Sequence, residues 1–270
     1  MSLARIALRI AAVEAIKGHT LVGQNVLDSP NGALDIQADG TLRTEKDKPF
    51  VSVFTDQGKA EGVTNRSLVE NGLVDIVFEI GLSTAMLEHD PETKESRLVG
   101  ITVPATDRTF EFFLDVVQRQ IADALNDPAN EWAEIYRGLH YHVVKVEYAG
   151  ARNTDDGQRL AGHQMRVTIA LADDPVKGEQ MDEDAPFMRF LDRLDATEDV
   201  TYQTQAAMIR SLIEGQNTPW QDILKRHGLT ADELLAVGLG PLAVKDDLSA
   251  PEFEVGSLEV EGADETDVTP

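Results

Sequence analysis

The residues best suited to do chemistry in this chain are two histidines that flank a tyrosine, His140-Tyr141-His142. Side chains two residues apart in a regular strand point to the same face, so His140 and His142 are predicted to lie side by side. Two imidazoles on one face suit a zinc or nickel site, and Asp155 and Asp156 follow as possible further ligands. A strand edge that carries polar side chains explains the same spacing, and we therefore expect no resident metal.

A second stretch, Trp220 to Leu235, is predicted to fold as helix, turn and helix, like half of a DNA-binding module. Thr230 and Glu233 form the capping-box pattern that opens its second helix. A recognition helix needs basic or amide side chains at this place, whereas this helix presents Asp232 and Glu233 and has no Lys or Arg. A packing role is therefore favoured over the reading of DNA.

Other catalytic signatures are missing from the sequence. It contains no phosphate-binding glycine loop, no dinucleotide fingerprint and no Gly-x-Ser-x-Gly elbow. The absence of cysteine excludes disulfides, thiolate metal sites and cysteine nucleophiles. Asp and Glu pairs are too common in this chain for any one pair to indicate acid–base catalysis. We expect a protein that is not an enzyme and that uses no cofactor.

The chain is strongly acidic, with 24 Lys and Arg against 48 Asp and Glu and a formal charge of −24 over 270 residues. Such a surface repels nucleic acid phosphates and anionic membranes. Solubility explains this charge, and so does a surface that avoids adhering to DNA. Arg5, Arg9 and Glu14 interrupt the apolar pattern that an N-terminal signal peptide would need. We expect assembly in the cytosol and no membrane partner.

The elements that must position any site begin with the stretch Gly72–Thr84, where apolar and other residues alternate as in a strand with one buried face. The β-rich run Phe50–Phe54 is its expected partner, and together they form the centre of a sheet. Further strands are expected at Val144–Tyr148, Val167–Leu171 and Leu98–Val103. Asp39-Gly40 is expected to turn a small hairpin.

Helical spacing of apolar residues predicts helices before and after these strands. They are Leu3–Ile16, a helix capped by Thr106 or Asp107 that runs through about Asn126, Glu131–Leu139, Phe187–Leu194, Tyr202–Ile213, Trp220–His227 and a last short helix through Val237. The fold class is therefore α+β, an antiparallel or mixed sheet flanked by helices, with a C-terminal helical extension and an acidic tail. The predicted divisions are 1–175 for the α/β domain, 186–245 for the helical extension and 246–270 for the tail.

Two polar segments, Thr55–Asn71 and Gly150–Gly162, are long for simple turns between strands, and loops of that length are usually functional or mobile. We expect them to contact neighbouring subunits or partners. The candidate contact residues are Asp56, Lys59, Glu61, Asn65, Arg66, Arg152, Asp155, Asp156 and Arg159.

The last segment, Asp246–Pro270, has nine acidic residues and no basic ones. Within it, Phe253 and Val255 alternate with glutamates, as do Leu258 and Val260. A disordered, solubilising tail is the favoured interpretation. The alternative is an extended arm that adds a strand to a neighbouring subunit or to the sheet of its own chain. Phe253 and Val255 are accordingly also candidate interface residues.

This order of elements resembles that of the tail terminator, or tail completion, proteins of long-tailed phages and prophages. The resemblance covers about Leu3 to Pro175, and the later helices and the tail are additions to it. It depends on the N-terminal amphipathic helix, Leu21–Ser29, the extended pair Pro49–Thr55 and Val74–Leu82, the helix Thr109–Leu125, a loop carrying Asp156-Gly157 and Arg159-Leu160-Ala161-Gly162, and the closing strand Gln164–Leu171.

The resemblance implies a structural virion protein that forms a six-fold ring at the head-proximal end of the tail tube and ends tube growth. Its implied partners are further copies of itself, the tail tube protein, the head-side neck or connector proteins, and genomic DNA that passes through the lumen without sequence-specific binding. Its place is the tail or neck of the virion. Another neck or tail component, such as a head–tail stopper or a tube or baseplate adaptor, is the alternative. A metal-dependent enzyme and a DNA-binding accessory protein are further competitors.

Overall fold

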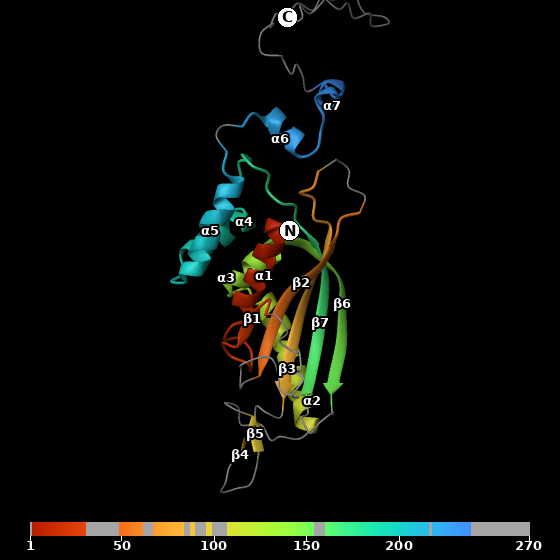
Figure 1. The fold of residues 1–270 in the computed structure, drawn as a ribbon, viewed down its shortest axis with the longest axis vertical. Helices are drawn as coiled ribbons and strands as arrows, with labels where there is room; N and C mark the ends of the chain where they lie inside the picture. The colour runs from red at the N-terminus through yellow and green to blue at the C-terminus, as the bar shows by residue number, and fades with distance from the viewer. Residues whose placement is uncertain are drawn as a thin grey trace, which may run out of the picture. The chain divides into compact units, whose positions relative to one another are not determined.

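A computed structural model describes residues 2–30, 49–61, 67–83, 87–89, 96–98, 107–153, 160–215 and 218–238. Its helices are α1 (Leu3–Ile16), α2 (Asp107–Asn126), α3 (Glu131–Gly138), α4 (Pro186–Asp195), α5 (Val200–Ile213), α6 (Trp220–Arg226) and α7 (Ala231–Ala236) (Figure 1). Its strands are β1 (Val26–Asp28), β2 (Phe50–Lys59), β3 (Leu73–Ser83), β4 (Leu87–His89), β5 (Ser96–Leu98), β6 (His140–Asn153) and β7 (Leu160–Leu171).

The main sheet has the strand order β1-β2-β3-β7-β6, so the stretch expected at the centre of the sheet is its middle strand. β1 runs parallel to β2, and the other neighbours are antiparallel, which makes the sheet mixed and confirms the α+β class. The helix-facing side chains of β3, among them Ile76, Phe78 and Ile80, are completely buried. On the opposite face, Phe50 of β2 covers Gly81, where a Cβ would lie 2.3 Å from the Phe50 ring.

The first helix is more deeply buried than an amphipathic helix lying on a sheet would be. Residues around most of its circumference are inaccessible, including Ala4, Ala7, Leu8 and Ala11. Contacts with α2, α3 and α4 on one side and with β1 and β2 on the other explain this burial. The alanines permit close approach of these neighbours, so α1 forms the centre of the core rather than its outer layer.

The helices α4 and α5 join the same core. Phe190, Leu191 and Leu194 of α4 and Ile209 of α5 belong to one cluster of buried side chains with α1 and the sheet. The predicted boundary between an α/β domain and a helical extension therefore does not separate two cores. The chain instead divides into Met1–Gly228 and Leu229–Pro270.

The ends of the helices are held by side chains from distant parts of the chain. Asp174, just after β7, accepts hydrogen bonds from the backbone N–H groups of Leu3 (2.8 Å) and Ala4 (2.9 Å) at the start of α1. Asn71, just before β3, donates to the same carboxylate at 2.9 Å. One carboxylate thus ties α1, β3 and β7 together, and it satisfies donors that the first turn of a helix leaves unpaired.

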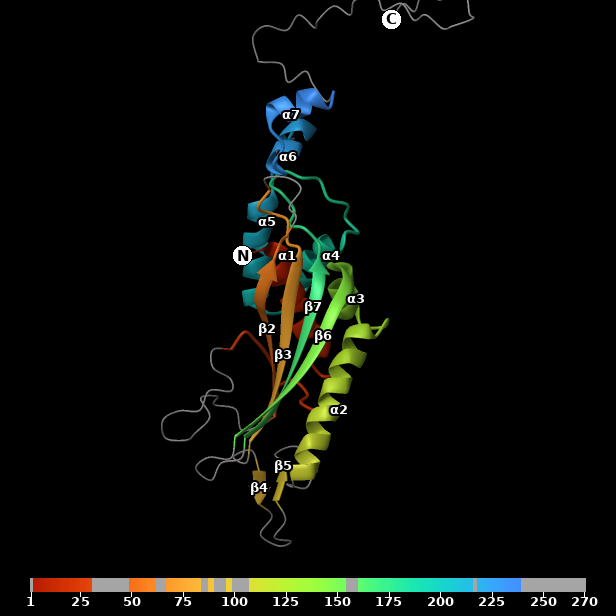
Figure 2. The ribbon, with the colours of Figure 1, turned by 90° about the vertical axis from the view of Figure 1, so that its right-hand side faces the viewer.

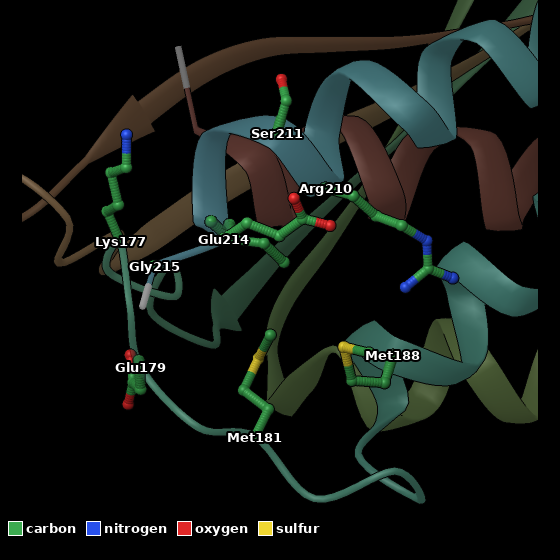
Figure 3. A pocket seen from close by; sticks show the side chains of 9 residues that line it. Lys177, Glu179, Met181, Met188, Arg210, Ser211, Glu214 and Gly215 are labelled. Carbon is green, nitrogen blue, oxygen red and sulfur yellow. The ribbon is translucent and has the colours of Figure 1, made fainter. Parts of the chain in front are cut away.

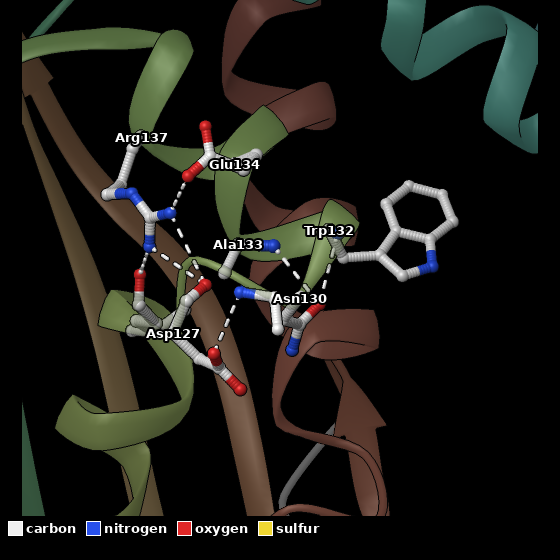
Figure 4. A network of polar contacts seen from close by, with 8 residues as sticks. Asp127, Asn130, Trp132, Ala133, Glu134 and Arg137 are labelled. Atoms are coloured by element: carbon white, nitrogen blue, oxygen red, sulfur yellow. Dashed lines mark hydrogen bonds and ion pairs between the residues drawn. The ribbon is translucent and has the colours of Figure 1, made fainter.

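A second network, made of hydrogen bonds, joins the ends of α1, α2 and α3 (Figure 4). Asn130 caps α3 by accepting from the N–H groups of Trp132 and Ala133, and it donates to the Ala15 carbonyl at the end of α1 (2.9 Å). Arg137 donates to the Leu125 carbonyl at the end of α2 at 2.7 Å. These bonds hold three helix ends in one arrangement beneath the sheet.

Several predictions concern residues outside the described ranges. The hairpin at Asp39-Gly40 lies there, as does most of the strand expected at Leu98–Val103, of which only Leu98 is described, as the last residue of β5. Among the described helices, none combines the length and the apolar character that a membrane-spanning segment requires.

Candidate functional site

The two histidines that suggested a metal site point to opposite faces of the sheet, so the predicted side-by-side arrangement is wrong. His140 lies opposite Leu171 of β7, and His142 lies opposite the preceding residue, Ala170, because the register shifts between them. Consecutive residues of β7 face opposite sides, and so must their partners. A β-bulge at Tyr141 thus separates the two imidazoles, which cannot bind one ion as a pair from one face.

His140 instead lies in an apolar setting at the start of β6. Neither of its ring nitrogens has a hydrogen-bond partner, and its ring meets the edge of Tyr136 with centroids 5.1 Å apart. Burial, together with the nearby His142 and Arg137, lowers the pKa of His140. This imidazole is held neutral and packs as a core side chain.

The predicted contact segments include the ends of the neighbouring strands. β2 continues to Lys59, so Asp56 and Lys59 lie on an exposed strand end after a bulge and not in a loop. Glu61 follows that strand and forms an ion pair with Lys59. β6 continues to Asn153 and includes Arg152. Regular pairing with β3 and β7 extends these strands beyond their apolar segments, which is why composition alone placed their ends too early.

The rest of the candidate contact residues lie outside the described ranges. They are Asn65, Arg66, Asp155, Asp156, Arg159, Phe253 and Val255.

The two connections between these strands lie at opposite ends of the sheet. Leu73, after the β2–β3 connection, pairs with Ala170, whereas Ser83 at the other end of β3 pairs with Leu160, after the β6–β7 connection. The 11 residues of β3 separate the two ends by about 34 Å at the usual rise per residue. Figure 1 shows β2 ending at the top and β6 at the bottom. The two segments therefore cannot form one continuous contact surface.

The described residues bring one imidazole and two carboxylates together between α2 and β7. His163 Nε2 lies 3.4 Å from Glu111 and His163 Nδ1 lies 3.7 Å from Asp115. One ligand atom from each residue lies within 4.8 Å of the others, close enough to share a divalent cation. The two ring nitrogens face different carboxylates, however, and an imidazole that lies between them and bridges α2 and β7 explains this geometry without an ion.

A hollow of about 770 Å³ lies beside α4 and α5 (Figure 3). The guanidinium of Arg210 at its wall is already bound to Asp192 at 2.7 Å and Asp195 at 2.9 Å. Ser211 donates its hydroxyl to the Met208 carbonyl at 2.7 Å, and no histidine is among the described lining residues. Among the described lining residues, the Ser211 hydroxyl is therefore directed to a backbone carbonyl and not to a base that would activate it.

The most unusual surface of the molecule is the edge strand β6 (Figure 2). Every residue from Tyr141 to Gly150 is exposed, although the strand is rich in valine and tyrosine. Val143, Val146 and Tyr148 lie on its helix-facing side, yet Val146 is 41% and Tyr148 66% exposed. The cause is that α2 packs over β3 and β7 and leaves the helix-facing side of β6 uncovered by the described chain.

A second hollow, of about 520 Å³, continues this surface between β6 and α2. It is lined by Tyr148, Gly150 and Ala122, with His163 behind them. Phe112 of α2 adds an aromatic ring that is 66% exposed. We call this combination of the free edge of β6 (Tyr141–Gly150) and the hollow beside α2 the β6 groove. The alternation Val144–Val146–Tyr148 predicted the strand, but nothing local in it indicated that the strand would lie at an edge.

The Trp220–Leu235 segment forms two short helices that belong to different units of the chain. α6 lies in Met1–Gly228, and α7 lies in Leu229–Pro270. The capping box of Thr230 and Glu233 is confirmed, and α7 carries Asp232 and Glu233 in its first turn. Neither property suits a helix that enters a DNA groove.

No protein-family model and no curated protein matches the chain.

Proposed function

We propose that this protein is a structural component of a phage tail, a tail terminator whose copies assemble into a ring, six-fold by its resemblance, at the head-proximal end of the tail tube. The observation that carries this proposal is the β6 groove. From Lys145 to Asn153 the strand keeps a regular register, without the bulges that blunt most free edges. Exposed valines and tyrosines on such an edge are typical of a surface that another polypeptide covers.

The arrangement of the sheet also supports this role. A ring placed between a tail tube and a head needs contacts toward both of these neighbours as well as around its circumference. The β2–β3 and β6–β7 connections lie at opposite ends of β3, and β6 lies along the side between them. One sheet therefore offers two ends for axial contacts and one edge for a neighbour within the ring.

The net charge of −24 suits a ring through which DNA passes. A wall with excess negative charge repels the phosphates and does not retain the duplex. The described residues also contain no convergent set of nucleophile and base in either hollow. A role by contact rather than by catalysis agrees with both observations.

The experiment is to polymerise purified tail tube protein with and without this chain and to locate the chain by electron microscopy. We expect rings at one end of the tubes and a shorter mean tube length as the amount of chain rises. The Ile76→Asp chain, which we expect not to fold, is the control. Binding along the tube wall or at the baseplate end would reject the terminator role and favour another tail component.

Metal-dependent chemistry is the competing function, and the Glu111–Asp115–His163 cluster is where the described chain could support it. Equilibrium dialysis against Zn²⁺ and Mn²⁺ separates the two. Stoichiometric binding that is lost in His163→Gln but kept in His227→Gln, whose imidazole also faces a carboxylate, would favour the enzyme. We expect no difference between the two variants.

A further inference from the structure

We propose that the β6 groove receives the C-terminal arm, Glu252–Glu261, of a neighbouring copy as an added strand. This inference rests on the proposed function, because it assigns the contact that closes the ring. It joins two features that the chain otherwise leaves unexplained, an uncovered strand edge in the core domain and a strand-like apolar pattern in an acidic tail.

The groove has the chemistry of a strand acceptor. β6 pairs with β7 on one side, and on its other side no strand of the described chain supplies hydrogen bonds to its backbone. An added strand would satisfy these N–H and C=O groups. Side chains on the helix-facing side of that strand would then cover Val146 and Tyr148 and enter the hollow that Ala122 of α2 lines.

The arm has the pattern of a strand donor. In Glu252-Phe253-Glu254-Val255 and again in Leu258-Glu259-Val260-Glu261, apolar and acidic residues alternate with a period of two. Each half places its apolar side chains on one face of a strand and its carboxylates on the other. The alternation shifts by one residue at Gly256-Ser257, so a bulge at this pair is needed to bring both halves of the added strand into phase. The first six residues of the arm, Glu252–Ser257, match in length the segment Lys145–Gly150, over which β6 keeps a regular register and is exposed.

The charges of the two partners are compatible. With the apolar side chains of the arm toward α2, its glutamates fall on the open face of the sheet. There β6 presents Lys145 and β7 presents Arg166, with Glu147 and Asp75 beside them. Acidic and basic groups are thus balanced at this edge, whereas acidic residues outnumber basic ones two to one in the whole chain. A strongly acidic arm is repelled least at such a place.

The length of the chain permits the exchange between copies. Residues 239–251 join the last described residue, Gly238, to the arm. At about 3.3 Å per residue, they reach up to about 43 Å. This reach is close to the length of β6 itself, about 46 Å for its 14 residues, so the linker is long enough for an arm to leave its own copy. Arm and groove are different surfaces, and such a heterologous contact generates a ring or a filament.

Three full-length double variants test the exchange by light scattering coupled to size exclusion. The edge variant is Val146→Glu/Tyr148→Glu, and the arm variant is Phe253→Glu/Val255→Glu. The control is Met208→Glu/Leu212→Glu, which alters two equally exposed apolar residues of α5. We expect the edge and arm variants to dissociate at concentrations at least tenfold above those at which the wild type and the control remain assembled.

Mixing the edge and arm variants gives the decisive result. Each supplies the surface that the other lacks, so the mixture should form a dimer with one copy of each. A mixture that stays monomeric while the wild type assembles would overturn the inference. Rings formed by the edge variant alone and by the arm variant alone would overturn the inference too, and would leave the proposed function intact.

A peptide of residues 249–262, followed by fluorescence anisotropy, provides a readout that does not depend on ring assembly. It should bind the arm variant, whose groove is empty, and should bind the edge variant at least tenfold more weakly. Equal binding to both variants would place the arm elsewhere. Protection of β6 amides from hydrogen exchange in a strictly monomeric wild type, lost in the arm variant, would show that the arm folds back on its own chain and would overturn the exchange between copies.

Discussion

At the scale of single residues, a β-bulge decides what His140 and His142 can do. The two-residue spacing was sound evidence for a shared face only in a regular strand, and the register shift at Tyr141 reverses one of the two side chains. A bulge has no reliable sequence signal, because it arises from how β6 pairs with β7. The alternation of β3 had no such interruption, and its buried face could be predicted residue by residue.

The buried His140 should make the stability of the fold depend on pH. Its pKa is lowered in the folded protein by burial, so below its usual value of about 6.5 the unfolded chain binds a proton that the folded chain does not. Stability contributed by this residue is therefore complete above pH 6.5 and falls as the pH drops, by at most about 1.4 kcal/mol per pH unit. Urea melts of the wild type and of His140→Phe between pH 7.5 and 5.5 should show a smaller loss in the variant.

His19→Phe is the matched control for this measurement, since His19 is exposed and is not among the groups that lower the pKa of His140. It should retain the pH dependence of the wild type. An identical pH dependence in wild type and His140→Phe would mean that the buried imidazole is not the responsible group.

At the scale of elements, the sequence predicted where strands and helices lie far better than it predicted what surrounds them. α1, α2 and β3 agree with their predicted ranges because apolar periodicity is local. The strand ends at Lys59 and Asn153 lie beyond the predicted ones, since pairing with distant strands extends them. The exposure of β6 depends on the strand order and on the position of α2, neither of which is a local property.

The core role of β3 predicts that Ile76→Asp does not fold. Ile76 is fully buried, and an unpaired carboxylate there costs several kcal/mol against a total stability of about 5–15 kcal/mol. Circular dichroism of Leu73→Asp, on the same strand but 41% exposed, should show a cooperative thermal transition. A cooperative transition of the Ile76→Asp chain as well would contradict the placement of this side chain.

The carboxylate that joins α1, β3 and β7 predicts a measurable loss in Asp174→Ala. The variant leaves the first-turn N–H groups of Leu3 and Ala4 without their acceptor, which should lower the free energy of unfolding by about 1–2 kcal/mol. Asp173→Ala removes one exposed hydrogen bond, to the Asn71 N–H, and should cost less. Chemical denaturation measures the free energy of unfolding of both variants. Equal losses would show that the cap formed by Asp174 stabilises the fold no more than the single exposed hydrogen bond of Asp173.

At the scale of the whole molecule, we propose that the chain acts through a contact surface, the β6 groove. Arg210 and Ser211 in the hollow beside α4 and α5 already bind neighbouring groups, whereas β6 exposes apolar side chains and a backbone edge that no strand of the described chain pairs with. The sequence supplied the acidic charge and the arm as hints of assembly, but it placed the expected contacts in the two loops. We propose instead that the contacts lie along the edge of the sheet, because the two loops lie at opposite ends of β3.

The central claim is that copies of the chain assemble into a ring through the edge of β6. Electron microscopy of the full-length chain tests this claim most directly. We predict closed rings with six-fold symmetry, each built from six copies of the 29.6 kDa chain, that form with the wild type and fail to form with Val146→Glu/Tyr148→Glu. A wild-type chain that forms no ring, either alone or on tail tubes, would contradict the claim.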